Sequence, residues 1–140
     1  MPSTLKFSVI IFLHLLLMTD LSAQTKHPTI VLNDIYFGKE KFELQATSWK
    51  QLDQLAAMLQ ENHELKVKIA GHTDSKGDEE VNMNLSINRA DAVKKYLIDA
   101  GVAHHRIKSV GYGEHKPAET NETEEGKEKN RRVTFRILEK

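Results

Sequence analysis

The pattern of hydrophobic and polar positions predicts one domain in which strands and helices alternate. Residues 30–37 are rich in β-branched and aromatic side chains and end at Gly38, which is typical of a strand. A helix is predicted next. It starts near Ser48, whose spacing from Gln51 is that of a capping box, and it stops at Asn62. Its hydrophobic stripe consists of Trp49, Leu52, Leu55, Ala56 and Leu59.

The rest of the chain continues this alternation. Residues 65–70 switch to a period of two, with apolar positions facing one way and lysines the other, which predicts a half-buried strand. A polar loop at 72–78 leads into a helix at 80–100, which Gly101 ends. The remaining expected segments are a strand at 106–112, a long acidic loop at 113–130 and a strand through Val133, Phe135 and Ile137. This order predicts a sheet with both helices packed on one face.

The N-terminus has the composition of a secretory signal peptide. Lys6 precedes an apolar run from Phe7 to Met18, and Ala23 offers a small residue for cleavage. An uncleaved membrane anchor is the alternative, but spanning a bilayer takes about 20 apolar residues and this run is shorter. The expected organisation is a signal peptide at 1–23, a short leader at 24–29 and a single domain at 30–140. Its destination would be the periplasm or the cell exterior.

Charge and cysteine content exclude several functions. The chain has 20 Lys and Arg against 20 Asp and Glu, and loss of residues 1–23 removes one charge of each sign, so the secreted form stays neutral. General nucleic-acid binders need a basic excess, which argues against that class. Without cysteine there is no disulfide, thiolate zinc site, catalytic thiol or cysteine-linked lipid anchor.

The remaining polar residues form no recognisable catalytic motif. The histidines lack the i, i+4 spacing that places two metal ligands on one helical face, and no Gly-x-Ser-x-Gly sequence marks a serine nucleophile. The acidic pairs, Glu79 with Glu80 and Glu124 with Glu125, are interpreted as solvated. We therefore predict neither an enzyme nor a metal or cofactor site.

Two charged residues are candidate ligand contacts. Arg89 lies on the hydrophobic stripe of the second predicted helix, where an unpaired charge is costly. A head group that reaches the sheet edge, or a salt bridge, would be a structural explanation. Asp74 lies in the loop after a strand, where binding residues concentrate, although beside Ser75 and Gly77 it also suits a turn. One anion and one cation at neighbouring element ends would complement a zwitterionic ligand.

An ordered series of residues resembles the OmpA-like peptidoglycan-binding domain family. The matching positions are Gly71-His72-Thr73-Asp74, Gly77, Asn82, Leu85-Ser86, Arg89-Ala90, Val93, Leu97, Gly101, Gly111-Tyr112-Gly113-Glu114, Pro117, Asn121, Gly126 and Asn130-Arg131-Arg132-Val133. They extend over nearly all of the chain after the leader. The resemblance implies an α+β fold, a β/α/β/α/β-β sandwich whose helices pack on one face of a mixed four-stranded sheet.

The resemblance also implies non-covalent binding of the peptidoglycan stem peptide. In the family, the aspartate of the Gly-His-Thr-Asp motif receives the ammonium of diaminopimelate, and the arginine of the Leu-Ser-x-x-Arg-Ala motif receives a carboxylate. These positions are Asp74 and Arg89 here. Thr73 and Asn82 are expected to add neutral hydrogen bonds, although Asn82 equally suits a helix start.

Basic residues near the last strand have structural interpretations. Arg131 and Arg132 point to opposite faces of a strand, so only one can support the site, and packing is predicted for both. The family often has arginine after the loop glycine, where this chain has Lys127. Lysine keeps the charge but not the bidentate geometry.

The expected protein tethers itself, or a partner, to the cell wall from the periplasm. Because the chain has no cysteine for a lipid anchor and no membrane span after signal cleavage, outer-membrane association is expected through a protein partner. The alternative function is a periplasmic protein–protein interaction module that uses the 113–130 loop. A wall hydrolase is a third hypothesis.

Overall fold

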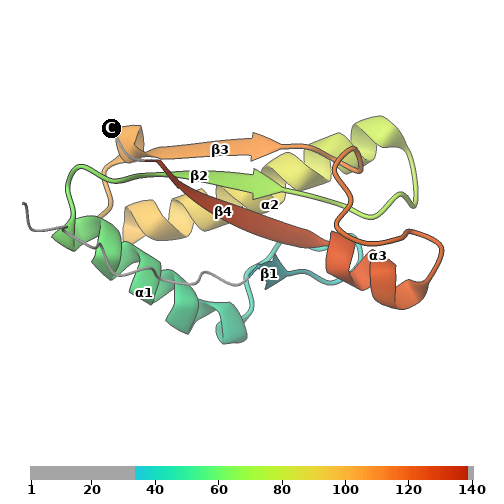
Figure 1. Cartoon of the computed structure of the whole chain (residues 1–140), viewed down its shortest axis with the longest axis horizontal. Helices are drawn as coiled ribbons and strands as arrows, with labels where there is room; N and C mark the ends of the chain where they lie inside the picture. The colour runs from blue at the N-terminus through green and yellow to red at the C-terminus, as the bar shows by residue number, and fades with distance from the viewer. Residues whose placement is uncertain (1–33, 139–140) are drawn as a thin grey trace, which may run out of the picture.

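The computed structural model describes residues 34–138 of the 140-residue chain. The expected signal peptide at 1–23, the leader at 24–29 and the start of the first strand lie outside the described residues. The described elements are β1 (Ile35–Tyr36), α1 (Ala46–Glu61), β2 (Lys66–Gly71), α2 (Glu79–Asp99), a 3₁₀ turn (His104–Arg106), β3 (Ile107–Gly111), α3 (Glu124–Asn130) and β4 (Arg132–Leu138) (Figure 1).

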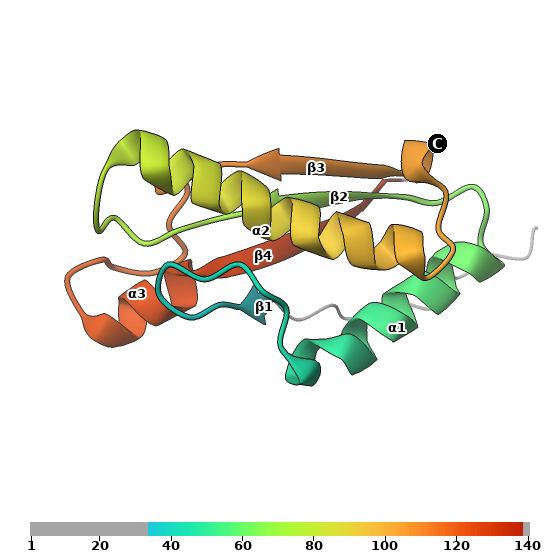
Figure 2. The same cartoon turned by 180° about the vertical axis from the view of Figure 1, so that it is seen from behind.

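The strands form one mixed four-stranded sheet in the order β1-β4-β2-β3. β2 and β3 run parallel, and β4 is antiparallel to both β2 and β1. Helices α1 and α2 cover one face of this sheet, as Figures 1 and 2 show from its two sides. The predicted α+β arrangement, with the helices on one face, is therefore confirmed.

A hydrophobic core fills the space between the sheet and the two long helices. Alternation along β2 directs Val67 and Ile69 into it, and the α1 stripe from Leu52 to Leu59 is buried as predicted. Trp49 is an exception, because its side chain is 50% exposed. The predicted capping box is also wrong, since α1 begins at Ala46 and Ser48 is a buried residue of its first turn.

The acidic segment 113–130 is not a plain loop, since it contains the short helix α3. The Thr123 hydroxyl accepts a hydrogen bond from the Gly126 N–H (3.1 Å) and so caps the helix. Asn130, which is fully buried, accepts from the backbone N–H groups of Ala118 (2.8 Å) and Glu119 (2.9 Å). These bonds fix the segment against the start of β4.

Helix α2 approaches the sheet closely where glycines replace side chains. A Cβ added to Gly71, at the end of β2, would overlap the carbonyl oxygen of Ser86 on α2. A Cβ at Gly111 on β3 would overlap the Ser86 hydroxyl. The close contact of Gly71 with Ser86 fixes the distance between the residues that follow Gly71 and those that follow Ser86. None of the helices within residues 34–138 combines the length and apolarity needed to cross a membrane.

Candidate functional site

Arg89 is fully buried in the middle of α2, at 0% exposure. Its Nε donates to the carbonyl oxygen of Lys41 (2.8 Å), and its Nη2 donates to that of Gly38 (3.0 Å). Its Nη1 donates to the carbonyl oxygen of His72 (2.8 Å). The inward position predicted from the sequence is confirmed. Its structural role is neither a head group at the sheet edge nor a direct salt bridge, because the guanidinium joins the loop after β1 to the end of β2.

Burial lowers the pKa of Arg89, but the side chain keeps its positive charge. Loss of water lowers the pKa of Arg89 to about 10, an effect that the negative charge of Asp74 opposes and the positive charge of Arg131 increases. The guanidinium therefore remains charged at neutral pH, inside the fold.

Asp74 forms the turn that the sequence suggested, and it also forms a buried ion pair with Arg131. Its Oδ1 accepts a hydrogen bond from the Lys76 N–H (3.0 Å), as in a turn that the aspartate itself closes. Its Oδ2 lies 2.9 Å from Nη1 of Arg131 in an ion pair whose side chains are each 8% exposed. Each carboxylate oxygen has two lone pairs, so both oxygens retain acceptor capacity.

Arg131 is buried, as a structural role predicts, but it also lines the candidate site through an ion pair with Asp74 that was not predicted. It lies between α3 and β4 with one guanidinium nitrogen on Asp74 and another 3.9 Å from Glu128. Arg132 points the other way, 3.6 Å from Asp34, so the strand alternation correctly predicted that only one of the two reaches the site.

The two uncharged candidate residues, Asn82 and Thr73, differ in whether the fold provides hydrogen-bond partners for their side chains. The Asn82 amide donates to a Glu114 carboxylate oxygen (2.7 Å) and to the Lys76 carbonyl oxygen (3.2 Å). It is not the helix cap, because the Asp78 side chain caps α2. The Thr73 hydroxyl, in contrast, is buried and has no hydrogen-bond partner among the described residues. A buried hydroxyl without a partner in the protein leaves a hydrogen bond that a water molecule or a ligand can supply.

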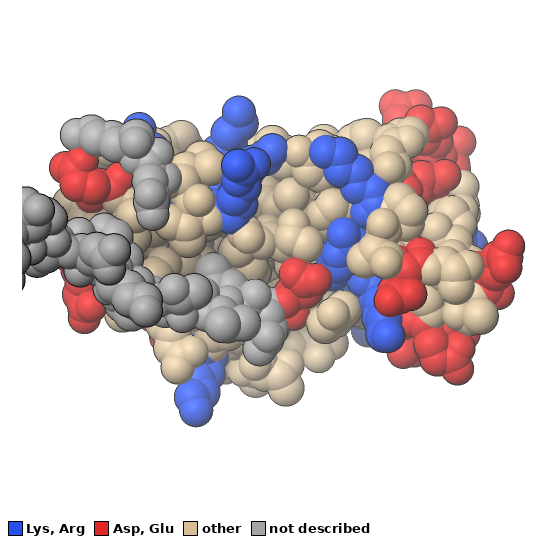
Figure 3. Space-filling view, in the orientation of Figure 1, with Lys and Arg blue, Asp and Glu red and all other residues tan. Residues whose placement is uncertain are grey.

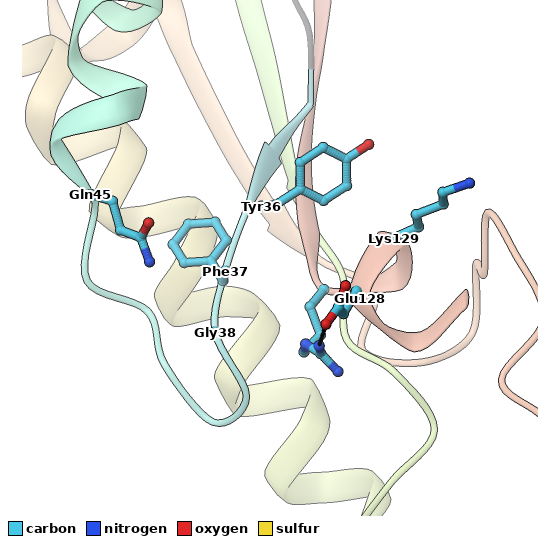
Figure 4. Close-up of a pocket in the computed structure, with 7 residues that line it drawn as sticks. Tyr36, Phe37, Gly38, Gln45, Glu128 and Lys129 are labelled. Carbon is cyan, nitrogen blue, oxygen red and sulfur yellow. Dashed lines mark ion pairs between the residues drawn. The ribbon is translucent and has the colours of Figure 1, made fainter. Parts of the chain in front are cut away.

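All four predicted residues line one small cavity of about 20 Å³, room for roughly one water molecule. Its lining is Lys39, Glu40, Thr73, Asp74, Lys76, Asn82, Leu85, Arg89 and Arg131. Arg131 also lines a neighbouring open groove of about 520 Å³ with Tyr36, Phe37, Gly38, Gln45, Glu128 and Lys129 (Figure 4). The small cavity and the larger groove thus share one lining residue, Arg131.

The charges around the small cavity favour a ligand that carries an anion. Among the residues that line the cavity, Lys39, Lys76, Arg89 and Arg131 supply four positive charges against the two negative charges of Glu40 and Asp74, so a carboxylate would balance part of the surplus. A guanidinium also binds a carboxylate through two parallel hydrogen bonds. Within residues 34–138, no group of three or more His, Cys, Asp or Glu side chains is arranged to hold a metal ion.

Comparisons with known proteins agree with this fold and this pattern of residues. The chain is 41% identical over 103 residues to the peptidoglycan-associated lipoprotein of Pasteurella multocida, covering 74% of this chain and 69% of that protein. It is 42% identical over 100 residues to outer membrane porin F of Pseudomonas fluorescens, covering 71% of this chain but only 31% of the porin. The chain therefore spans less than a third of that second relative.

A solved structure extends the agreement to three dimensions. The peptidoglycan-associated lipoprotein of Burkholderia pseudomallei superposes with a TM-score of 0.73 at 28% identity, over 75% of this chain and 89% of that one. The family model for the OmpA family matches residues 36–131, from β1 to the arginine that pairs with Asp74. The chain belongs to the OmpA family.

Proposed function

We propose that this protein binds peptidoglycan non-covalently, through the diaminopimelate of the stem peptide, at the cavity between Asp74 and Arg89. The observation that carries the proposal is the convergence of Thr73, Asp74, Asn82 and Arg89 on one cavity that holds a buried, unpartnered hydroxyl. The similarity to peptidoglycan-associated lipoproteins supports the same class of ligand.

The free end of diaminopimelate in a stem peptide is a zwitterion, with an ammonium and a carboxylate on one carbon. Its ammonium would donate to Asp74, whose Oδ1 otherwise accepts only a backbone N–H among the described contacts. Its carboxylate would lie toward Arg89 and Arg131 and neutralise their surplus charge. Charge-assisted hydrogen bonds of this kind contribute about 1.5–3 kcal/mol each.

The size of the cavity implies that the site opens when the ligand enters. A volume of about 20 Å³ does not hold an amino-acid end group. Lys39 and Glu40, which are exposed residues of the loop after β1, form one wall and are the part that has to move. The adjoining groove of about 520 Å³ gives the rest of the stem peptide a place beyond Arg131.

This function places the protein in the periplasm, associated with the outer membrane, as a non-enzymatic tether of itself or a partner to the wall. Similarity to a peptidoglycan-associated lipoprotein and to an outer membrane porin supports that location. An outer-membrane protein partner remains a prediction.

Retention on insoluble peptidoglycan sacculi tests the proposal. The Asp74→Asn variant keeps the side-chain shape but loses the charge that receives the ammonium. We expect about tenfold weaker retention or more, the equivalent of losing one charge-assisted hydrogen bond. Asp99→Asn is the matched control, because Asp99 is an exposed carboxylate at the far end of α2 that forms an ion pair with Lys95. Equal retention of the two folded variants would rule the site out.

A Thr73→Val variant separates ligand binding from stability. Because the Thr73 hydroxyl has no partner within the described fold, replacing it with a methyl group should leave the free energy of unfolding unchanged or raise it by about 1 kcal/mol. Binding to sacculi should nevertheless weaken. Urea unfolding and the sacculus assay on the same preparation provide both values. A loss of stability with unchanged binding would mean that the hydroxyl serves the fold and not the ligand.

A further inference from the structure

The face of the sheet that the helices leave uncovered is strongly basic. Side chains on this face come from alternate strand positions, and none of those in the described strands is acidic. We define the basic face as Lys66, Lys68, Lys108, Lys116, Arg132 and Arg136, of which Arg132 is buried, at 7% exposure. Asp34, which precedes β1, supplies a carboxylate 3.6 Å from Arg132. Figure 3 shows Lys and Arg side chains across this side of the molecule, whereas Asp and Glu gather at the end that holds α3.

Strand register brings three of these cations side by side. Lys68 on β2 pairs with Lys108 on β3 in one direction and with Arg136 on β4 in the other. Neighbouring strands are about 5 Å apart, so three like charges form a row across the sheet. Like charges directly opposite one another destabilise a sheet. Lys68 contacts Tyr112, but the repulsion among the three charges opposes folding, which suggests that the row serves a binding partner.

Two lysines of the basic face, Lys68 and Lys116, contact the side chain of Tyr112. Lys68 Nζ donates to the Tyr112 hydroxyl (2.7 Å), while Lys116 Nζ lies 3.7 Å from the centre of the same ring. These contacts lower the pKa of Tyr112, the hydrogen bond from Lys68 having the largest effect. The pKa of His72 falls to about 4, mainly through burial and further through the charges of Arg132 and Lys116. The positive potential therefore extends from the strands to the loop before α3.

We propose that the basic face binds the phosphate headgroups of an anionic lipid bilayer. Its cations are spread along a flat sheet, most of them on long flexible side chains, which suits a surface of mobile phosphates better than a partner with fixed carboxylate positions. Half-exposed Tyr36 lies on the same face, and tyrosines are favoured at membrane interfaces because they combine an apolar ring with a polar end. None of the basic-face residues lines the cavity at Asp74 or the neighbouring groove, and Tyr36, which lines the groove, is the one residue named here for both contacts.

Vesicle flotation tests this proposal on residues 24–140. That segment keeps the whole described core, which lies between Ile35 and Ile137, and it omits the apolar N-terminal run that would itself enter lipid. The protein should float with vesicles of phosphatidylglycerol and phosphatidylethanolamine at low salt and not with vesicles of phosphatidylcholine alone. Binding should weaken as salt rises.

Two triple variants with the same change in net charge supply the control. Lys66→Gln, Lys108→Gln and Arg136→Gln together should lower vesicle affinity about tenfold or more, because each cation near an anionic surface adds several-fold. Lys50→Gln, Lys94→Gln and Lys95→Gln, on α1 and α2, should lower it far less. The first triple variant should also resist urea at least as well as wild type, since it relieves the like-charge row.

Three results would overturn the proposal. One is no binding of wild type to phosphatidylglycerol vesicles at low salt, and another is equal loss in the two triple variants, which would reflect net charge alone. The third is self-association without vesicle binding, abolished by the first triple variant, because it would assign the face to the acidic end of a second copy. Failure here is distinguishable from failure of wall binding, because the first triple variant should keep sacculus retention and Asp74→Asn should keep vesicle binding.

Discussion

Replacing Gly71 with alanine should lower the free energy of unfolding by about 3 kcal/mol, at the upper end of what overpacking costs. The added Cβ would overlap a backbone oxygen of Ser86, so no side-chain rotation relieves the clash and α2 has to move away from β2. Gly71 precedes Asp74 by three residues and Ser86 precedes Arg89 by three. The same displacement should therefore separate the two ligand residues and weaken sacculus binding.

Gly38→Ala is the control for this prediction. An added Cβ at Gly38 meets only the flexible side chain of Lys41, and its backbone needs no positive φ. Urea unfolding should show a change of less than about 1 kcal/mol for Gly38→Ala. Wild-type stability in Gly71→Ala would show that the close contact between helix and sheet is easily relaxed.

Replacing Arg89 with methionine should destabilise the protein by about 3 kcal/mol. Three carbonyl oxygens would lose their charged donor, the buried one of His72 and the partly buried ones of Gly38 and Lys41, and an unsatisfied buried group costs about 1–3 kcal/mol. Removing a buried charge offsets part of that sum. The measurement is again urea unfolding, with Lys94→Met, a less buried position on the same helix, expected to change stability by about 0.5 kcal/mol or less.

Hydrogen exchange would locate the effect of the Arg89 substitution. The guanidinium holds the loop at Gly38 and Lys41 to the end of β2, so amides of that loop should exchange faster in the variant than those of α1. A uniform rise across all elements would mean that Arg89 supports the fold as a whole and does not specifically hold the loop.

Helices and strands whose hydrophobic residues recur at a regular spacing were predictable from the sequence. The burial of Arg89 was predictable for the same reason. The alternation in β2 and the stripe of α2 determine which face each side chain takes, and an arginine on that stripe has to enter the core. Its partners were not predictable, because they are backbone carbonyls 48, 51 and 17 residues away. Every residue has a backbone carbonyl, so the order of side chains does not show which carbonyl oxygens will accept a hydrogen bond.

The errors have similar physical causes. Helix α3 carries no hydrophobic stripe, since its buried residues are Gly126 and Asn130, and hydrogen bonds fix it in place of apolar packing. Trp49 fits the periodic pattern of α1 but lies at a helix start with little of the fold beside it. The Arg131 pairing with Asp74 joins residues 57 apart in the sequence, so only the tertiary structure reveals it.

The arrangement around β1 also determines how the protein responds to mechanical force. A pull on the chain before Ile35 reaches β1, whose two described residues are held by their pairing with β4. The Phe37 N–H donates to the Arg131 carbonyl oxygen (2.9 Å), and the Gly38 and Lys41 carbonyls accept from Arg89. Tension would therefore reach the two arginines of the candidate cavity together with Ile35 and Phe37, the first residues of the core along the described chain. Under the proposed function, ligand binding and the resistance of the chain to extension therefore depend on the same two side chains, Arg89 and Arg131.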